Sequence, residues 1–211
     1  MLEFNVKEEI LFPNYLWHAK INGVDNRELE KFVYTVQNQD PAGVSRSNVG
    51  GWHSHPYEEG DKPPDSFKEL LHDITEFTND FCFQKTGIND LYVGNYWFII
   101  NEPGSYNAPH HHMGSFLSCA YYIKVPENSG DITLEREDSA EYFLGNDIGK
   151  SPFTYINYRR KVEEGLLLVF PSWMKHGVSQ NQSNENRIVL SINFCSKTKN
   201  VNEKIQVGRR T

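Results

Sequence analysis

The chain has 211 residues, of which 38% are hydrophobic and 13% aromatic, and its formal net charge is −7. This size suits one domain, residues 1–211, with a buried core, and the negative charge argues against a nucleic-acid-binding surface. An N-terminal signal pattern and a membrane-length apolar run are both absent, and the three cysteines are widely spaced without a CxxC motif, so we expect a soluble, cytoplasmic protein with reduced thiols and no membrane partner.

The N-terminal part predicts short β segments over 4–22, interrupted at Pro13, and then a helix over about 25–37. Asp25 provides an N-cap and Glu28 follows three residues later, which is the pattern of a capping box. The apolar residues behind it recur at helical spacing.

A second helix is predicted over about 65–85, with Gly87 just past its end. Its apolar residues form one stripe, which is typical of a helix packed on a core. The two helices are expected to flank the sheets of a single domain.

Between these helices, residues 40–65 are rich in Gly, Pro, Ser and charged residues and show no periodicity. A loop of this length inside a compact domain is usually functional or disordered. It contains Trp52, His53 and His55, which we expect to cover an active site and contact substrate. The alternative is a surface loop, and as a metal site the His-x-His pair lacks a third ligand nearby.

From residue 90 onward the pattern changes to strands separated by turns, over 91–100, 110–125, 131–135, 153–158, 165–170 and 187–195. Short strands without interleaved helices indicate an antiparallel sandwich or jelly roll. The expected fold is mostly β with flanking helices, in the form of a double-stranded β-helix.

Three adjacent histidines stand at the beginning of the 110–125 segment. Alternate side chains on a strand share one face, so His110 and His112 could hold one metal ion while His111 points to the other face. His176, just past the strand 165–170, is the best candidate for a third ligand. The alternative is that the histidines form a solvated loop.

Arg187 begins the apolar strand that follows His176. A buried arginine is costly unless it meets an anion, and its planar guanidinium suits a carboxylate held by two hydrogen bonds. We therefore expect Arg187 to bind a ligand carboxylate, the alternative being an acidic residue of the chain.

Several segments in this order, more than any one of them alone, point to a known family: Ser47–Trp52, Trp97–Asn101, Pro103–Gly104, Pro109–His112, Ser118–Tyr122, Pro126–Gly130, Gly165–Ser172, His176 and Asn186–Ile188. The chain resembles the Fe(II)/2-oxoglutarate-dependent oxygenases, and within them the bacterial and phage branch that is similar to prolyl hydroxylases.

The resemblance implies that His110 and His176 bind Fe(II) and that Arg187 binds the distal carboxylate of 2-oxoglutarate. His112 stands where most of the superfamily has Asp or Glu, giving a site of three histidines. Iron(II) accepts imidazole well, so such a site is chemically feasible. Asp131 could provide a carboxylate only by folding back into the site, which we do not expect.

Many relatives also have a hydroxyl residue two positions after the arginine, where this chain has Val189. Tyr122 could replace that hydroxyl, since even-numbered positions from His110 share its face if the strand has no bulge. Asn101 and Ser118 are further candidates for contact with 2-oxoglutarate.

The function implied by the resemblance is hydroxylation of an unidentified substrate, such as a peptide or protein side chain, with 2-oxoglutarate and O2 as partners and a homodimer as a candidate assembly. Two alternatives remain open. One is a three-histidine metalloenzyme of the cupin type that does not use 2-oxoglutarate. The other is a non-enzymatic jelly roll with a binding or structural role.

Overall fold

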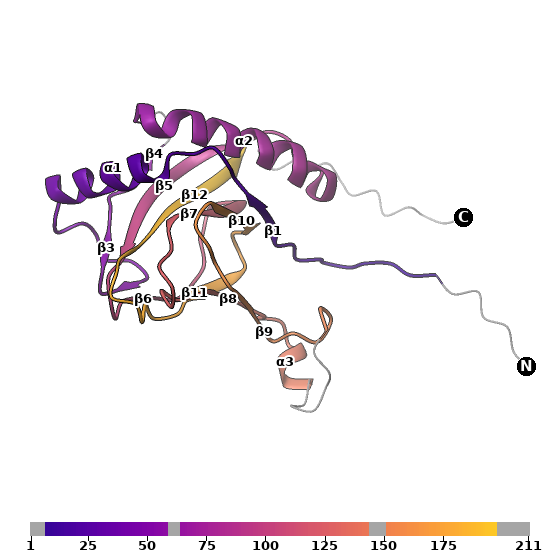
Figure 1. The fold of residues 1–211 in the computed structure, drawn as a ribbon. Coiled ribbons are helices and arrows are strands. Elements are labelled where there is room, and N and C mark those ends of the chain that lie inside the picture. The colour runs from indigo at the N-terminus through magenta and orange to yellow at the C-terminus, as the bar shows by residue number, and fades with distance from the viewer. Residues whose placement is uncertain (1–6, 59–63, 144–150, 198–211) are drawn as a thin grey trace, which may run out of the picture.

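The computed structural model describes residues 7–58, 64–143 and 151–197 as two antiparallel sheets, with two long helices over the larger sheet (Figure 1). Within these residues, the larger sheet has the spatial order β1 (Trp17–Lys20), β10 (Leu166–Pro171), β7 (Leu117–Lys124), β12 (Arg187–Ser196), β5 (Leu91–Asn101) and β3 (Trp52–His53), with β4 (Tyr57–Glu58) also paired to β5. The smaller sheet has the order β2 (Asn48–Val49), β6 (Tyr106–His110), β11 (Lys175–Val178), β8 (Ile132–Glu135) and β9 (Asn157–Arg160). The predicted fold class, a mostly β jelly roll with flanking helices, is confirmed.

Both predicted helices are present. α1 (Asn26–Gln39) begins after Asp25, whose side chain accepts hydrogen bonds from the backbone N–H groups of Arg27 and Glu28 at 3.1 Å each. α2 (Asp65–Thr86) ends before Gly87, which has φ +70°. A short helix, α3 (Ala140–Phe143), follows β8. No helix in the described part of the chain combines the length and the apolar character needed to cross a membrane.

Strand alternation divides the apolar residues into two cores on opposite faces of the larger sheet. On the outer face, Tyr121 and Phe98 pack beneath the helices with Phe67 of α2. On the inner face, Tyr122 and Phe170 belong to a second cluster. Of the two adjacent tyrosines, Tyr121 therefore belongs to the helix-covered core, and Tyr122 lies between the sheets.

The segment 110–125 was expected to be one strand, and this prediction is wrong. β6 ends at His110, residues 111–116 form a turn, and β7 begins at Leu117 in the other sheet. Strand alternation therefore cannot place His112 beside His110, nor Tyr122 on the same face as His110. The chain turns here because it passes from one sheet to the other.

The segment 40–65 was expected to be a loop, but part of it pairs with both sheets. β2 pairs with β6, while β3 and β4 pair with β5. These strands are two residues long, which is too short for any hydrophobic periodicity to reveal. In the N-terminal region the described structure begins its first strand only at Trp17, and the expected segment 4–6 lies outside the described residues.

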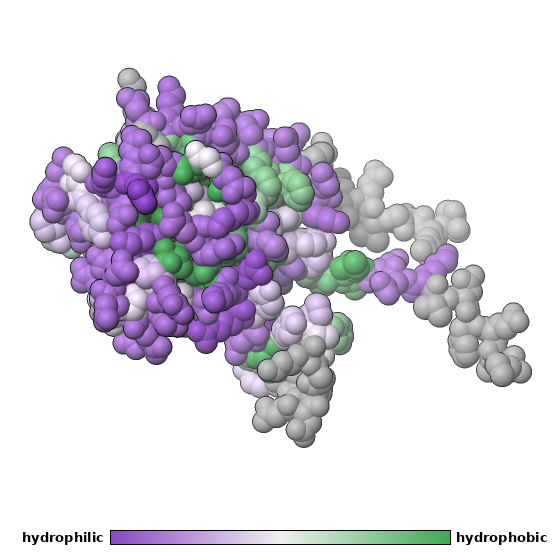
Figure 2. Space-filling model, viewed as in Figure 1, coloured by the Kyte–Doolittle hydropathy of each residue, from purple (hydrophilic) through white to green (hydrophobic). Residues whose placement is uncertain are grey.

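The surface in the view of Figure 2 is mostly hydrophilic, with hydrophobic side chains gathered in a recess between the helix-covered sheet and the smaller sheet. The described cysteines are all free, with Cys82 and Cys119 buried and Cys195 half-buried.

Replacing Phe67 with alanine should remove a buried contact of α2 with the larger sheet. Phe67 is fully buried and its ring lies 4.8 Å from that of Phe98, centroid to centroid. We expect a loss of about 3–5 kcal/mol in the free energy of unfolding, measured by chemical denaturation. Phe81→Ala, on an exposed position of the same helix, is the matched control and should cost less than about 1 kcal/mol. Equal losses in the two variants would contradict this account of the outer core.

Candidate functional site

A cavity of about 670 Å³ lies between the two sheets. This volume is ordinary for a small-molecule site and would hold a metabolite-sized ligand together with part of a second one. Alternate residues of β5 and β12 line its wall: Asn95, Trp97, Ile99 and Asn101 on β5, and Arg187, Val189, Ser191 and Asn193 on β12. The smaller sheet contributes histidines to the same cavity.

His110 and His176 are directly opposite each other on the paired strands β6 and β11 of the smaller sheet. Their ring centroids are 4.4 Å apart. His112 reaches the pair from the turn after β6, with its ring centroid 5.0 Å from that of His110 and 4.9 Å from that of His176. One nitrogen from each ring lies within 4.8 Å of the others. The structure therefore brings together the three histidines that were predicted as ligands.

The outer nitrogen of each ring has an oxygen partner. Nδ1 of His110 lies 2.8 Å from the Ala108 carbonyl, and Nδ1 of His176 lies 2.9 Å from the Met174 carbonyl. Nδ1 of His112 lies 2.7 Å from Oδ1 of Asn193. Carbonyl oxygens only accept hydrogen bonds, so each Nδ1 carries the proton and each Nε2 keeps its lone pair.

The electrostatics of this cluster favour a bound cation. Burial is the main cause that lowers the pKa of all three histidines, to about 4 for His112 and to about 3 for His176. The rings are therefore neutral near pH 7, as metal ligands must be. Nε2 of His110 and Nε2 of His112 then face each other at 3.1 Å with two lone pairs and no proton between them. A metal ion between them removes this repulsion, and nitrogens bound to one ion at about 2.1 Å lie about 3 Å apart.

Arg187 lies in the wall of the same cavity and is fully buried. Its Nη1 donates to the carbonyls of Ser129 and Gly130 at 2.7 and 3.0 Å, and its Nη2 donates to Oδ1 of Asn101 at 2.7 Å. Its Nε has no hydrogen-bond partner. Among residues 7–58, 64–143 and 151–197 no carboxylate lies within ion-pair distance of this guanidinium.

The charge of Arg187 is thus hydrogen-bonded only to neutral oxygens. Burial lowers its pKa, while Tyr122 and Asp131 raise it by a smaller amount. An unpaired buried charge costs several kcal/mol. A carboxylate bound in the cavity would neutralise it and could also engage Nε.

Gly130 makes room for this arrangement. It has φ +93°, and a Cβ atom added there would lie 2.2 Å from the Ser179 carbonyl oxygen and 3.0 Å from Nη1 of Arg187. Only glycine fits both the backbone conformation and the space. The turn 126–130 therefore serves to place two carbonyls beneath the guanidinium.

The three residues predicted to contact 2-oxoglutarate have different positions. Tyr122 lines the cavity near Arg187, which lowers the pKa of the phenol, although burial raises it by more. Asn101 lines the cavity and binds Arg187 directly. Ser118 does not line it; its hydroxyl lies 2.8 Å from Nδ1 of His112, behind the ring.

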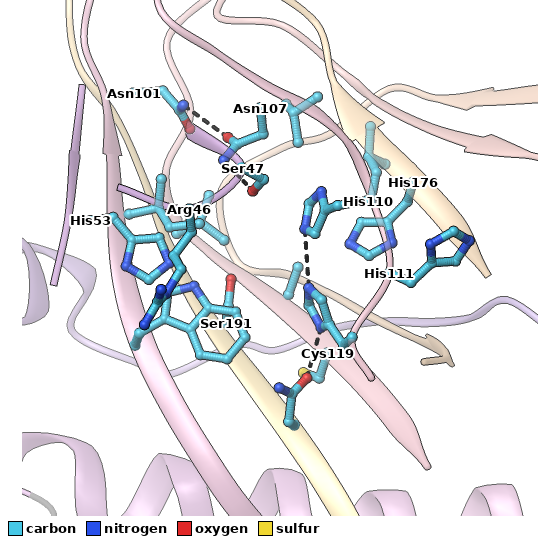
Figure 3. Close-up of a pocket in the computed structure, with 18 of the residues that line it drawn as sticks. Arg46, Ser47, His53, Asn101, Asn107, His110, His111, Cys119, His176 and Ser191 are labelled. Atoms are coloured by element: carbon cyan, nitrogen blue, oxygen red, sulfur yellow. Dashed lines mark hydrogen bonds between the residues drawn. The ribbon is translucent and has the colours of Figure 1, made fainter. Parts of the chain in front are cut away.

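The three residues predicted to cover the site also lie in different positions. His53 lines the cavity, lies across it from His110 and His176 (Figure 3), and stacks on Trp97 with ring centroids 5.6 Å apart. Trp52 faces the helix-covered core instead, and its Nε1 donates to the Asp40 carbonyl. His55 is exposed and its ring lies 3.7 Å from the Asp40 carboxylate.

His111 lies on the outer side of the histidine cluster, with its Nε2 2.5 Å from a Glu137 carboxylate oxygen (Figure 3). Asp131 pairs with Arg159 at 2.9 Å and does not line the cavity, so it provides no carboxylate to the three histidines.

Sequence reasoning missed Asn95, Asn193 and Trp97 as site residues. A signal for one of them was available: Ser191 and Asn193 are polar interruptions of an otherwise apolar strand, and they follow Arg187 with a period of two. Asn95 and Trp97 lie inside β5, and no charged residue of that strand marked them as part of a site.

Comparison with known proteins agrees with this site. Residues 95–193, which contain the three histidines and Arg187, match a family model described as "Putative 2OG-Fe(II) oxygenase". No curated protein is detectably similar to the chain in sequence.

Solved structures with a similar fold include two prolyl hydroxylases and an epimerase. A Pseudomonas putida prolyl-4-hydroxylase has a TM-score of 0.58 at 15% identity, over 86% of this chain and 92% of that one. A viral collagen prolyl hydroxylase from Paramecium bursaria Chlorella virus-1, in complex with 2OG, has a TM-score of 0.54 at 13% identity, over 84% and 94%. An epimerase of nogalamycin biosynthesis, solved with Fe3+ and alpha-ketoglutarate, has a TM-score of 0.59 at 14% identity, over 87% and 79%.

Residues 95–193 therefore match the 2OG-Fe(II) oxygenase family, and the resemblance seen in the sequence is confirmed over that segment. Iron and 2-oxoglutarate are the cofactor and co-substrate that define this family, in agreement with the sequence-based expectation.

Replacing Gly130 with alanine should destabilise the protein by more than the cost of a positive φ alone. Gly23→Ala is the matched control, since Gly23 has φ +87° and no atom within 4 Å of an added Cβ. We expect the control to lose about 1–3 kcal/mol and Gly130→Ala to lose about 1–3 kcal/mol more, because its Cβ collides with backbone. Equal unfolding free energies for the two variants, measured in urea, would show that the Ser179 backbone yields to the added atom.

Proposed function

We propose that this protein is a 2-oxoglutarate-dependent iron hydroxylase whose metal is held by three histidines, His110, His112 and His176. The observation that carries the proposal is that one cavity contains both inward-facing lone pairs without a cation and a buried cation without an anion. Three neutral imidazoles turn lone pairs inward, and a fully buried guanidinium lacks an anionic partner among the described residues. A metal ion and a dicarboxylate would satisfy both.

The three Nε2 atoms are the proposed ligands. Three protein ligands would leave other coordination positions of an iron ion available to small molecules, as an oxygenase needs. Their Nδ1–H groups are held by oxygen acceptors, which orients each ring before metal binds. Because all three ligands are neutral, the site has one negative charge fewer than a site of two histidines and one carboxylate.

Arg187 is the proposed partner of the distal carboxylate of 2-oxoglutarate. Ser129, Gly130 and Asn101 hold its guanidinium in place, so the side chain is oriented before the ligand arrives. Tyr122 is the proposed hydroxyl donor to the same carboxylate, and burial raises its pKa, which keeps the phenol protonated. Ser118 has no such role, because its hydroxyl lies behind His112.

The opposite side of the cavity is the proposed substrate side. His53 is buried there with Nδ1 2.7 Å from the Ser54 carbonyl, which leaves its Nε2 as a hydrogen-bond acceptor. Arg46 lies beside it at the wall of the cavity (Figure 3). These residues face the three histidines across the open space, so a substrate held here would lie between them and the metal.

When bound, iron(II) supplies the chemistry that couples conversion of 2-oxoglutarate and O2 to succinate and CO2 with hydroxylation of a substrate C–H bond. The residues of the chain bind and orient the two organic molecules. The two sheets and the stacked His53 and Trp97 rings would limit the access of water to the site.

The assignment of Arg187 can be tested by anaerobic titration. Metal-free protein receives iron(II) and then 2-oxoglutarate, and the visible charge-transfer band of the chelate is recorded. Arg187→Met should bind iron(II) as the wild type does but should bind 2-oxoglutarate about a hundredfold or more weakly, because a buried charge partner is lost.

Arg159→Met, which removes an exposed arginine outside the cavity, is the matched control and should behave as the wild type. Tight iron binding without any band in the wild type would favour the three-histidine metalloenzyme that does not use 2-oxoglutarate. Failure to bind iron would leave a non-enzymatic jelly roll.

The assignment of the third ligand can be tested on the adjacent histidines. Loss of a hydrogen-bond partner of a metal ligand weakens metal binding by about 10- to 100-fold. His112→Ala should weaken iron(II) binding by more than this, because it removes a ligand itself. His111→Ala should leave it unchanged, because His111 lies outside the cluster and contacts Glu137. Similar affinities for the two variants, measured by competition with a chelator, would remove His112 from the proposed ligand set.

A further inference from the structure

The three histidines are held in place by different means. His110 and His176 are opposite residues of paired strands, so the hydrogen bonds of the smaller sheet set their spacing. His112 lies in the turn after β6, where no strand pairing fixes it. A ligand in a turn needs another restraint if its ring is to lie 5.0 Å from that of His110 and 4.9 Å from that of His176, centroid to centroid.

That restraint comes from a row of polar side chains that crosses the larger sheet. Asn193 on β12 is directly opposite Asn95 on β5 and directly opposite Ser118 on β7. The side chain of Asn193 contacts both, with Nδ2 3.0 Å from Oδ1 of Asn95 and Oδ1 3.0 Å from Oγ of Ser118. Oγ of Ser118 also lies 2.8 Å from Oγ of Ser172, at the end of β10.

His112 is attached to the middle of this row. Its Nδ1 lies 2.7 Å from Oδ1 of Asn193 and 2.8 Å from Oγ of Ser118. Its backbone N–H also donates to the Ser172 carbonyl at 3.0 Å. Every contact in this group joins His112 to the larger sheet, although the other two histidines belong to the smaller one.

The direction of the hydrogen bonds determines which ring nitrogen of His112 carries the proton and which keeps its lone pair. The amide N–H of Asn193 is directed to Asn95, so Oδ1 is the atom that faces His112, and it can only accept. The proton of the ring is therefore on Nδ1, and the lone pair of Nε2 points to His110 and His176. Asn193 and Ser118 are 7% and 0% exposed, so water does not compete for these bonds.

We propose that Asn193, supported by Ser118, is a positioning residue for the metal centre: it orients the ring of His112 and selects the tautomer that binds metal. This inference rests on the proposed function, since it takes His112 to be a ligand. It also explains how a ligand outside any strand can complete a site between two sheets. Asn95 lines the cavity at the far end of the same hydrogen-bonded row.

The experiment compares metal affinities, not turnover. Metal-free wild type, Asn193→Leu and Asn193→Asp are titrated with cobalt(II), recording the visible ligand-field bands and the dissociation constant by chelator competition. We expect Asn193→Leu to bind about 10- to 100-fold more weakly, as other outer partners of metal ligands do. Asn193→Asp should restore the wild-type affinity or exceed it, because a carboxylate oxygen accepts the same Nδ1–H and Asn95 can turn its amide to donate.

Asn79→Leu is the matched control for a loss of stability. Asn79 on α2 makes hydrogen bonds to the backbone N–H and carbonyl of Leu91 at 2.9 and 3.0 Å, away from the cavity. This variant should lower the melting temperature and leave the cobalt(II) affinity unchanged. The tautomer of His112 in the metal-free proteins is read from its imidazole 15N shifts, and Asn193→Leu should lose the single Nδ1–H form.

The outcomes distinguish a failure of the positioning role of Asn193 from a failure of the proposed metal site. Unchanged affinity in Asn193→Leu, or equal weakening in Asn193→Leu and Asn193→Asp, would overturn the positioning role while leaving the three-histidine site intact. A wild type that binds neither cobalt(II) nor iron(II) would overturn the proposed function itself.

Discussion

A guanidinium enclosed between two sheets, with no carboxylate of the described residues beside it, is the constraint on which the rest of this cavity depends. Three neutral oxygens hold Arg187, and the turn 126–130 must contain a glycine for two of them to approach. Hydrogen bonds to neutral groups satisfy the donors but do not neutralise the charge. This unpaired charge is the reason for the proposal that an anionic ligand occupies the cavity.

The second constraint is that the three proposed metal ligands are held in place by two different sheets. Strand pairing alone sets the distance between His110 and His176. The polar row through Asn193 and Ser118 sets the position of His112. Because the row belongs to the larger sheet, the metal site would also tie the sheets together, so that metal binding and the packing of the sheets support each other.

Much of the fold was predictable from local signals. The capping of α1 by Asp25, the apolar stripe of α2 and the apolar strands β5 and β12 each depend on residues close together in the sequence, and each prediction is confirmed. The predictions for 40–65 and 110–125 failed for a common reason. In both segments the structure is decided by pairing with strands far along the chain, and a strand of two residues or a turn between sheets has no periodicity of its own.

The sequence by itself determined the identities of the residues that could do chemistry. These are three imidazoles, which are common metal ligands, and one arginine in an apolar strand, where a surface charge is not expected. It did so because these side chains are rare in apolar strands and their order matches a known family. Only the tertiary structure decided that His112 is a turn residue held by Asn193, that Trp52 packs in the helix-covered core while His53 faces the cavity, and that Arg187 has no carboxylate beside it in the described chain. Those facts depend on which strands become neighbours in space. When two strands are about 80 residues apart in the sequence, the packing of the whole domain determines whether they pair.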